Sequence, residues 1–244
     1  MERLTSRNNP HIKELSSLKK GDPSLFLVEG HHLVEMASAS GSLLEVLSVE
    51  AYPGKEKSLL VSYEIIEKLS ASKTPEGIIG VCRKIEKENA KDGPVLLLDR
   101  VQDPGNVGTL LRSALAFGFS KVYSIEGTAS FYGSKAIASS QGAIFSLALK
   151  EGLKEEEAVA LFKSQGFRLI GSALENAEDF RALSLPDDKY CLILGNEGQG
   201  MSPSLLGKTD VNAYIPISGI DSLNVGVAGG ILMERLQELA GKVI

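Results

Sequence analysis

The chain has 244 residues, 43% of them apolar, which is enough to form one large hydrophobic core or two smaller ones. Its formal net charge of −5 excludes the class of uniformly basic nucleic-acid-binding proteins. The acidic excess falls entirely after residue 84, where 15 Lys and Arg face 20 Asp and Glu, so a local basic surface remains possible before that point.

The first segment, 3–20, begins with turn-forming residues and then places Ile12, Leu15 and Leu18 at helical spacing. This pattern predicts a short amphipathic helix. Basic side chains outnumber acidic ones around it, as expected of a surface that contacts nucleic-acid phosphates, although an ordinary solvated helix explains the composition equally well. The candidate phosphate ligands are Arg3, Arg7, Lys13, Lys19 and Lys20.

The rest of the first 84 residues alternates short strand and helix patterns. The paired histidines His31 and His32 have no third ligand nearby, which is typical of surface or capping residues rather than of a metal site. A unit this small buries little apolar surface alone, so we expect it to stay in contact with the rest of the chain. Strands are expected at 25–28, 43–49, 59–61 and 78–82, and helices at 33–40 and 63–69.

The composition changes at 85–93, a charged stretch almost without large apolar residues, which we predict to be a linker between two domains, 1–84 and 94–244. After it, strands and helices alternate, which implies parallel strands joined by right-handed crossovers and a doubly wound α/β fold. The expected strands are 95–99, 121–125, 144–149, 168–174, 190–195 and 211–217, and the last helix runs through Leu239.

Two features of the sequence bear on the cellular compartment in which the protein works. Cys82 and Cys191, the only cysteines, lie in apolar surroundings without metal-ligand spacing and are expected to be buried free thiols in a reducing compartment. The first residues lack a signal-peptide pattern, and no apolar run reaches the ~18 residues of a membrane span. We therefore expect a soluble cytoplasmic protein without a metal site.

Two loops late in the chain are suited to hold a ligand. Gly195–Gly200 contains three glycines, which let backbone N–H groups approach a ligand closely, and Ile215–Asn224 opens into the final helix. Ligands bind at the carboxyl ends of parallel strands, so two such loops in succession indicate one pocket.

A third polar segment, Asp99–Arg112, follows the first strand of this part of the chain. Asp103 or Asn106 is suited to cap the next helix, and Arg112 lies nearly two turns beyond Asn106 on roughly the same face. Because Arg112 stands among large apolar residues, it is either functional or part of a buried structural ion pair.

Other catalytic classes are poorly supported. Neither G-x-G-x-x-G nor a P-loop occurs, so a nicotinamide oxidoreductase explains only the α/β pattern. All three histidines lie in the first 32 residues and no G-x-S-x-G occurs, which disfavours Ser-His-Asp hydrolysis.

Three motifs carry a resemblance to a known family. N-x-G-x-x-x-R at 106–112, L-G-N-E-G-x-G at 194–200 and I-P-I-x-G…S-L-N-V at 215–225 resemble, in order, the motifs of the SpoU (TrmH-type) RNA ribose 2′-O-methyltransferases of the SPOUT superfamily. Residues 1–84, with S-R-N-N-P-H-I-K-E-L and F-L-V-E-G, look like the family's ribosomal-protein-like domain that binds the RNA substrate. The resemblance covers the whole chain.

This resemblance implies an α/β fold with a C-terminal trefoil-knot domain, mostly parallel in its sheet, after a small N-terminal α/β domain. It also implies that S-adenosylmethionine binds in the knot and that two copies of the chain, as a homodimer, form each active site jointly. The implied cofactor contacts are Leu194, Gly195, Asn196, Gly198, Gly200, Ile215, Pro216, Ile217, Leu223 and Asn224.

The implied catalytic residues are Asn106, Arg112, Glu197, Ser222 and Asn224, and Arg112 and Lys135 join the candidate RNA ligands. A free guanidinium, with a pKa above ~12, is a poor base, so we expect Arg112 to anchor the phosphate beside the target ribose and to stabilise the forming alkoxide. This class of N-terminal extension accompanies enzymes of ribosomal RNA, which makes 23S rRNA the expected substrate and tRNA the alternative.

The chain departs from the family pattern at three places. The third motif is one residue short between Gly219 and Ser222, Gly226 replaces a serine or alanine at the start of the last helix, and Ala138 stands where an arginine is expected. None of these is among the implied catalytic residues. A catalytically inactive RNA-binding protein with the same fold therefore remains the alternative.

Overall fold

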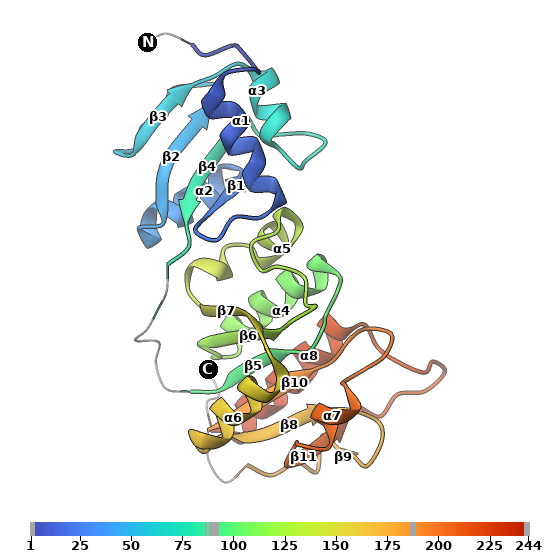
Figure 1. Ribbon diagram of the computed structural model, residues 1–244. Coiled ribbons are helices and arrows are strands. Elements are labelled where there is room, and N and C mark those ends of the chain that lie inside the picture. Colours follow the sequence, from blue (N-terminus) through green and yellow to red (C-terminus); the bar gives the residue numbers. More distant parts are fainter. Residues whose placement is uncertain (1–2, 86, 88–92, 186–188, 242–244) are drawn as a thin grey trace.

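The computed structural model describes residues 3–85, 87, 93–185 and 189–241 and contains two sheets, one in each part of the chain (Figure 1). Most of the expected linker, 86 and 88–92, lies outside the described residues. Within the described part, we find no helix with the length and apolarity needed to cross a membrane.

The N-terminal sheet has four strands in the order β1-β4-β2-β3, with β4 antiparallel to both of its neighbours and β2 parallel to β3. The side chain of Asn9 caps the first helix, Pro10 occupies its first turn, and Ile12 and Leu15 are buried. The elements are α1 (Pro10–Ser17), η1 (Leu18–Lys20), β1 (Leu25–Glu29), α2 (His31–Ser40), β2 (Leu43–Ser48), β3 (Lys57–Leu60), α3 (Tyr63–Leu69) and β4 (Ile78–Arg83).

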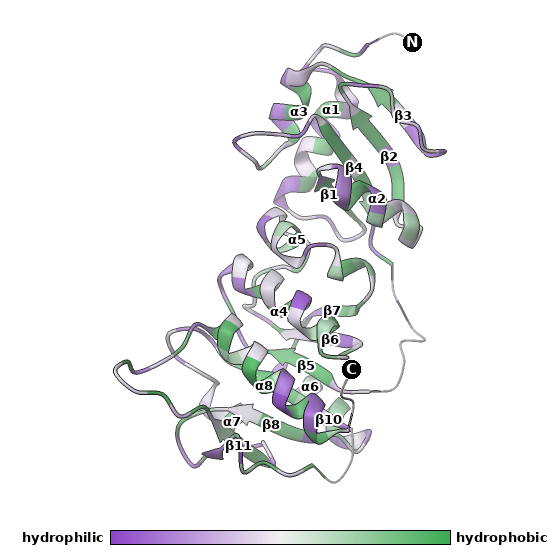
Figure 2. Cartoon of the chain, turned by 180° about the vertical axis from the view of Figure 1, so that it is seen from behind, coloured by the Kyte–Doolittle hydropathy of each residue, from purple (hydrophilic) through white to green (hydrophobic). Residues whose placement is uncertain are grey.

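The C-terminal sheet has seven strands in the order β7-β6-β5-β10-β8-β11-β9, and all of its strand pairs are parallel. Its central strands β5 and β10 are buried along their whole length and belong to the hydrophobic stretches of Figure 2. The strands are β5 (Val95–Leu98), β6 (Lys121–Ile125), β7 (Ala148–Leu153), β8 (Arg168–Ser172), β9 (Glu178–Asp179), β10 (Tyr190–Leu194) and β11 (Val211–Tyr214).

The helices of this part cover both faces of the sheet. α4 and α8 pack together over one face, whose core also includes residues of the N-terminal unit, while α6 and α7 cover the other face. The helices are α4 (Pro104–Ala116), α5 (Ser134–Ser140), η2 (Ala143–Phe145), α6 (Glu155–Ser164), α7 (Pro203–Leu206) and α8 (Val225–Leu239). This confirms the expected α/β class.

Two of the expected strands differ from the observed ones by three residues or more. The apolar run 144–149 does not form a strand throughout, since 143–145 is a 3-10 turn and β7 begins only at Ala148. Phe145 instead packs toward Phe26 of the N-terminal unit, with ring centroids 6.2 Å apart. The strand expected at 211–217 ends at Tyr214, because Pro216 cannot donate to a strand ladder.

The two units are in contact, as expected from the small size of the first. The ring of Phe26 lies 4.9 Å from that of Tyr132, and Nζ of Lys84 lies 4.3 Å above the same Tyr132 ring. Both cysteines are buried and free, as expected. The contact places the N-terminal sheet beside α5 and η2.

Candidate functional site

The start of α4 follows directly from its sequence. The side chain of Asp103 accepts hydrogen bonds from the backbone N–H groups of Gly105 and Asn106, and Pro104 occupies the first helical turn. Nζ of Lys135 on α5 lies 2.8 Å from Oδ2 of Asp103. The lysine and these backbone donors hold the pKa of Asp103 below its usual value, so the N-terminus of α4 is held in place from two sides.

One carboxylate joins this N-terminus to the loop after β10. Oε1 of Glu197 accepts from the backbone N–H of Asp103 at 3.1 Å and from Nδ2 of Asn106 at 3.0 Å. Oε2 accepts from the backbone N–H of Gln102 at 3.1 Å. Partial burial raises the pKa of Glu197, but the bonds from Asn106 and the two backbone groups outweigh it and hold the pKa below its usual value. Glu197 is therefore an ionised acceptor engaged by α4 rather than a free base.

Asn106 extends this connection to α8. Oδ1 of Asn224 accepts from the backbone N–H groups of Gly226 and Val227 at the start of α8, so its Nδ2 is free to donate to Oδ1 of Asn106 at 2.9 Å. The orientation of both amides is thus set by their other partners. Glu197, Asn106 and Asn224 form a continuous chain of hydrogen bonds, here called the amide relay, which ties together three segments far apart in the sequence.

The loop after β10 is folded by its own residues. Oδ1 of Asn196 accepts from the N–H of Gly198 at 2.9 Å, and its Nδ2 donates to the carbonyl of Arg100 at 2.9 Å. A Cβ on Gly195 would lie 2.3 Å from backbone atoms of both Gly200 and Met201. Only glycine fits at this position, because the two sides of the loop come this close.

This loop lines a cavity of about 500 Å³, within the range of about 300–1,000 Å³ that is usual for small-molecule sites. The loop after β11 and the segment 172–175 after β8 line the same cavity. Three neighbouring strands, β10, β8 and β11, therefore end at one pocket, as expected for a parallel sheet.

Most of the expected cofactor ligands meet in this cavity. The first loop contributes Gly195, Asn196, Gly198 and Gly200. The second loop contributes Ile215, Ile217 and Leu223. Three others do not line it: Leu194 is fully buried in β10, Pro216 is exposed outside the cavity, and Asn224 caps α8.

The expected catalytic residues fall into two groups. Glu197 and Ser222 line the cavity, and the amide relay places Asn106 and Asn224 beside Glu197. Arg112 lies on the exposed face of α4, and within the described residues no hydrogen bond or ion pair engages it. The interpretation of Arg112 as half of a buried ion pair is therefore wrong, because its apolar neighbours Leu110 and Leu111 point into the core while it points outward.

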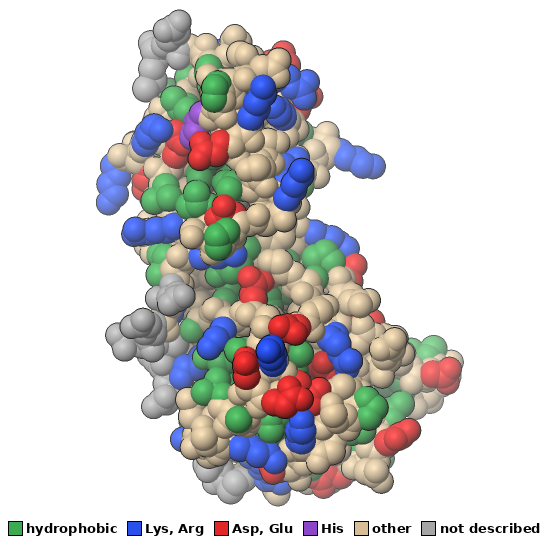
Figure 3. Space-filling view, viewed as in Figure 1, with side chains coloured by type: hydrophobic (Ala, Val, Ile, Leu, Met, Phe, Trp, Pro, Cys, Tyr) green, Lys and Arg blue, Asp and Glu red, His purple; other side chains and the backbone are tan. Residues whose placement is uncertain are grey.

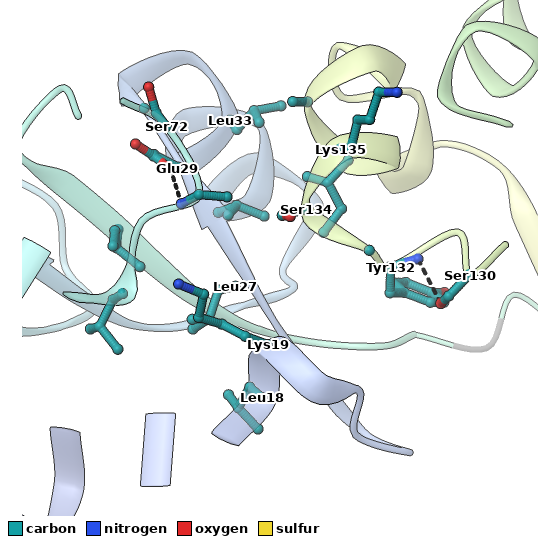
Figure 4. A pocket seen from close by; sticks show the side chains of 18 of the residues that line it. Leu18, Lys19, Leu27, Glu29, Leu33, Ser72, Ser130, Tyr132, Ser134 and Lys135 are labelled. Atoms are coloured by element: carbon teal, nitrogen blue, oxygen red, sulfur yellow. Dashed lines mark hydrogen bonds between the residues drawn. The ribbon is translucent and has the colours of Figure 1, made fainter. Parts of the chain in front are cut away.

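A second cavity, of about 740 Å³, lies between the two units. Of the expected RNA ligands, Lys19 and Lys20 line it from the N-terminal unit and Lys135 lines it from α5. Figure 4 shows Lys19 and Lys135 on the two sides. Ala138, where an arginine was expected, lines the same cavity. The sequence therefore identified cationic residues on both sides of one interdomain groove.

The other expected RNA ligands lie elsewhere on the N-terminal unit. Arg3, Arg7 and Lys13 are exposed but do not line the groove, and Arg3 donates to the carbonyl of Val49 at 2.8 Å. In Figure 3, Lys and Arg side chains are spread over both units, and a group of Asp and Glu side chains lies among them on the C-terminal part. Lys19 is only partly available, since Nζ donates to the carbonyl of Ser70 at 2.8 Å.

Sequence reasoning missed two sets of site residues. Ser172–Glu175 line the cofactor-sized cavity because β8 is the neighbour of β10, and the strand order cannot be read from the chain. Asp99, 1% exposed, accepts from the backbone N–H of Ser202 at 2.8 Å, and Arg100 beside it has a φ of 57°. The signal in the sequence for this second connection, between Asp99 and the backbone of Ser202, was a carboxylate placed directly after a buried strand.

Comparison with known families and proteins gives two matches to family models. The SpoU rRNA Methylase family matches residues 93–234, and the MRM3-like substrate binding domain matches residues 9–80. The second match covers the segment for which the sequence indicated RNA binding.

Individual relatives resemble the chain over nearly its full length. The 23S rRNA (guanosine(2553)-2′-O)-methyltransferase RlmP of Bacillus subtilis is 33% identical, with 97% of this chain and 100% of RlmP covered. A crystal structure of an RNA 2′-O ribose methyltransferase is 28% identical with a TM-score of 0.81, covering 98% of this chain and 99% of that one. An AdoMet-bound rRNA methyltransferase of Sinorhizobium meliloti, 23% identical, has a TM-score of 0.87 with 97% of both chains covered, and so shares the fold.

Proposed function

The chain belongs to the SpoU rRNA methylase family, and on this premise we propose that it methylates a ribose 2′-hydroxyl of 23S ribosomal RNA. Its activity is that of an S-adenosylmethionine-dependent RNA 2′-O-ribose methyltransferase with the α/β trefoil-knot fold of the family. The observation that carries the proposal is the amide relay, which joins all three motifs at the wall of a cofactor-sized cavity. Because the substrate is ribosomal RNA, the proposed location is the cytoplasm.

The cavity lined by Gly195 and Leu223 is the proposed cofactor site. Its volume is usual for a small-molecule site. Its wall is rich in glycine, and a Cβ at Gly195 would collide with the opposite side of the loop, so the cavity fits a ligand that is held largely by backbone groups. When bound, S-adenosylmethionine supplies an electrophilic methyl group on its sulfonium. The residues around it position the ribose and exclude water.

The proposed role of the amide relay is to hold α4, α8 and the loop after β10 in fixed positions around the site. Asn106 and the backbone N–H groups of Gln102 and Asp103 donate to Glu197 from the start of α4, and the lowered pKa keeps the carboxylate ionised. Asn106 and Asn224 then fix α4 and α8 relative to the loop after β10. Ser222, exposed at the cavity wall, is available to the ribose.

Arg112 is the proposed anchor for the phosphate beside the target ribose and stabilises charge on the reacting oxygen. It is exposed, and among the described residues it has no hydrogen-bond or ion-pair partner, which leaves its five N–H donors for RNA. Arg112→Lys should keep part of the activity, because the charge remains. Loss of all turnover with unchanged RNA and cofactor affinity would instead assign the base role to Arg112.

We further propose a homodimer in which Arg112 serves the cofactor site of the second copy. Arg112 does not line the cavity of its own chain, and the helices α4 and α8 expose Leu115 (39%) and Val227 (52%), apolar side chains suited to an interface. Mixing two inactive variant proteins, Arg112→Ala and Leu223→Arg, tests this arrangement. The mixture should regain activity after subunit exchange if each site takes Arg112 from the second copy. If each site is built from one chain, the mixture regains none.

The proposed RNA path runs through the groove between the units. Lys19, Lys20 and Lys135 line both of its sides, and the groove lies next to the start of α4, where Lys135 pairs with Asp103. RNA bound there would enter the site past the N-terminus of α4.

The experiment that tests the function uses the purified protein with S-adenosylmethionine and deproteinised RNA. Digestion to nucleosides should reveal one 2′-O-methylated nucleoside in 23S rRNA and none in tRNA. Methylation of tRNA alone would replace the proposed substrate. Cofactor and RNA binding without any methylated nucleoside would identify an inactive RNA-binding protein.

A further inference from the structure

The cofactor-sized cavity has an unusual charge distribution. Its described lining residues include three carboxylates, Glu175, Glu197 and Asp221, and no Lys, Arg or His. The three acidic groups come from three different loops, which follow β8, β10 and β11. Such a wall attracts cations and repels phosphate-bearing ligands such as dinucleotides.

Two of these carboxylates have no neutralising partner in the part of the chain that the structure describes. Among the described residues, neither Glu175 nor Asp221 has a hydrogen-bond donor or a basic partner, in contrast to Glu197, which accepts three hydrogen bonds. Both side chains are exposed to solvent at the cavity. Their charge is therefore available to whatever ligand enters.

The proposed reaction converts a charged ligand into a neutral one at the same position. S-adenosylmethionine carries a permanent positive charge at its sulfonium, and S-adenosylhomocysteine, left after methyl transfer, has a neutral thioether there. The rest of the two molecules is identical. A negative cavity wall consequently distinguishes substrate from product by one charge.

We infer that Glu175 and Asp221 act as specificity-determining residues that favour S-adenosylmethionine over S-adenosylhomocysteine, so that fresh S-adenosylmethionine replaces the product at the site. The inference rests on the proposed cofactor site. Electrostatic attraction across a solvated cavity is modest for each carboxylate, so the two act additively with Glu197.

The test is calorimetric titration of the full chain with S-adenosylmethionine, S-adenosylhomocysteine and sinefungin, whose protonated amine replaces the sulfonium. Glu175→Gln and Asp221→Asn should each weaken the two cationic ligands about two- to fivefold, the size of one exposed charge pair, and change S-adenosylhomocysteine less than about twofold. The matched control is Glu156→Gln, the same change at an exposed position of α6 that does not line the cavity.

A second arm needs no variant. Raising the salt concentration should weaken wild-type binding of the cationic ligands more than that of S-adenosylhomocysteine. Equal losses for charged and neutral ligands, in the variants or with salt, would overturn the inference while leaving the cofactor site in place. Failure of the wild type to bind any of the three ligands would overturn the proposed site itself.

Discussion

Asn106 is the residue on which the site geometry depends most, because one amide group serves two motifs. Its Nδ2 donates to Glu197 and its Oδ1 accepts from Asn224. The sequence predicted these three residues as one set from their motifs. It could not predict that Glu197 is already occupied by α4, because hydrogen bonds between residues 91 positions apart appear only after folding.

Truncation at Asn106 tests the amide relay. Asn106→Ala removes two hydrogen bonds, one of them to a carboxylate, and should lower the free energy of unfolding by about 1–2 kcal/mol. It should also lower kcat at least about tenfold, since α4 and α8 lose their fixed geometry. Denaturant unfolding and single-turnover assays measure the two effects. Asn8→Ala, at an exposed residue without a described side-chain hydrogen bond, is the control and should change neither.

The lowered pKa of Glu197 predicts a pH dependence of stability. A carboxyl group whose pKa is lower in the folded state than in the unfolded chain stabilises the fold at pH values above its ordinary pKa of 4.5. This contribution is lost as the pH falls through the pKa of the folded state. Between about pH 6 and about pH 3, the free energy of unfolding should therefore fall more for the wild type than for Glu197→Gln. Parallel urea-unfolding curves for the two proteins across this range would contradict the prediction.

At the scale of elements, the loop after β10 and the start of α8 depend on close backbone approach. A Cβ at Gly226 would lie 3.1 Å from Oδ1 of Asn224 and 3.2 Å from Cγ2 of Thr109, so the glycine that departs from the family pattern lets α8 pack tightly on α4. The sequence identified the loops and most strands because glycine, proline and apolar runs determine them locally. The strand expected at 144–149 was misplaced, because the apolar side chain of Phe145 packs against Phe26 of the other unit and does not belong to a strand.

Substitution of Gly195 tests the loop. Gly195→Ala should abolish measurable cofactor binding, because the new Cβ would collide with the backbone of Gly200 and Met201 at 2.3 Å. Gly230→Ala on α8, where a Cβ meets nothing within 4 Å, is the control and should raise the stability by up to about 1 kcal/mol. Titration and thermal unfolding report the two outcomes. Unchanged cofactor affinity in Gly195→Ala would show that the ligand binds elsewhere.

At the scale of the whole molecule, the contact between the units creates the groove that the RNA proposal requires. The sequence already showed that the acidic excess belongs to the C-terminal part, and the basic cluster in 3–20 was the reason to expect RNA contacts in the N-terminal unit. The groove was not visible, because it depends on how Phe26, Tyr132 and Phe145 bring the two units together. The pairing of α4 with a second copy stays a prediction.

Restoring the expected arginine tests the groove. Ala138→Arg adds a cation to the wall lined by Lys135 and should strengthen RNA binding and steepen its salt dependence by about one phosphate contact. Ala160→Arg, the same change at an exposed position of α6 outside both cavities, controls for net charge. Equal gains in the two variants would show that the groove is not the RNA path.

The proposed methylation of a 23S rRNA ribose is tested most directly by a map of 2′-O-methylation across ribosomal RNA from cells with and without the protein. We predict that one methylated ribose in 23S rRNA disappears without the protein, returns with the wild-type chain, and returns less completely with Asn106→Ala. Identical methylation maps in the presence and absence of the protein would contradict this function.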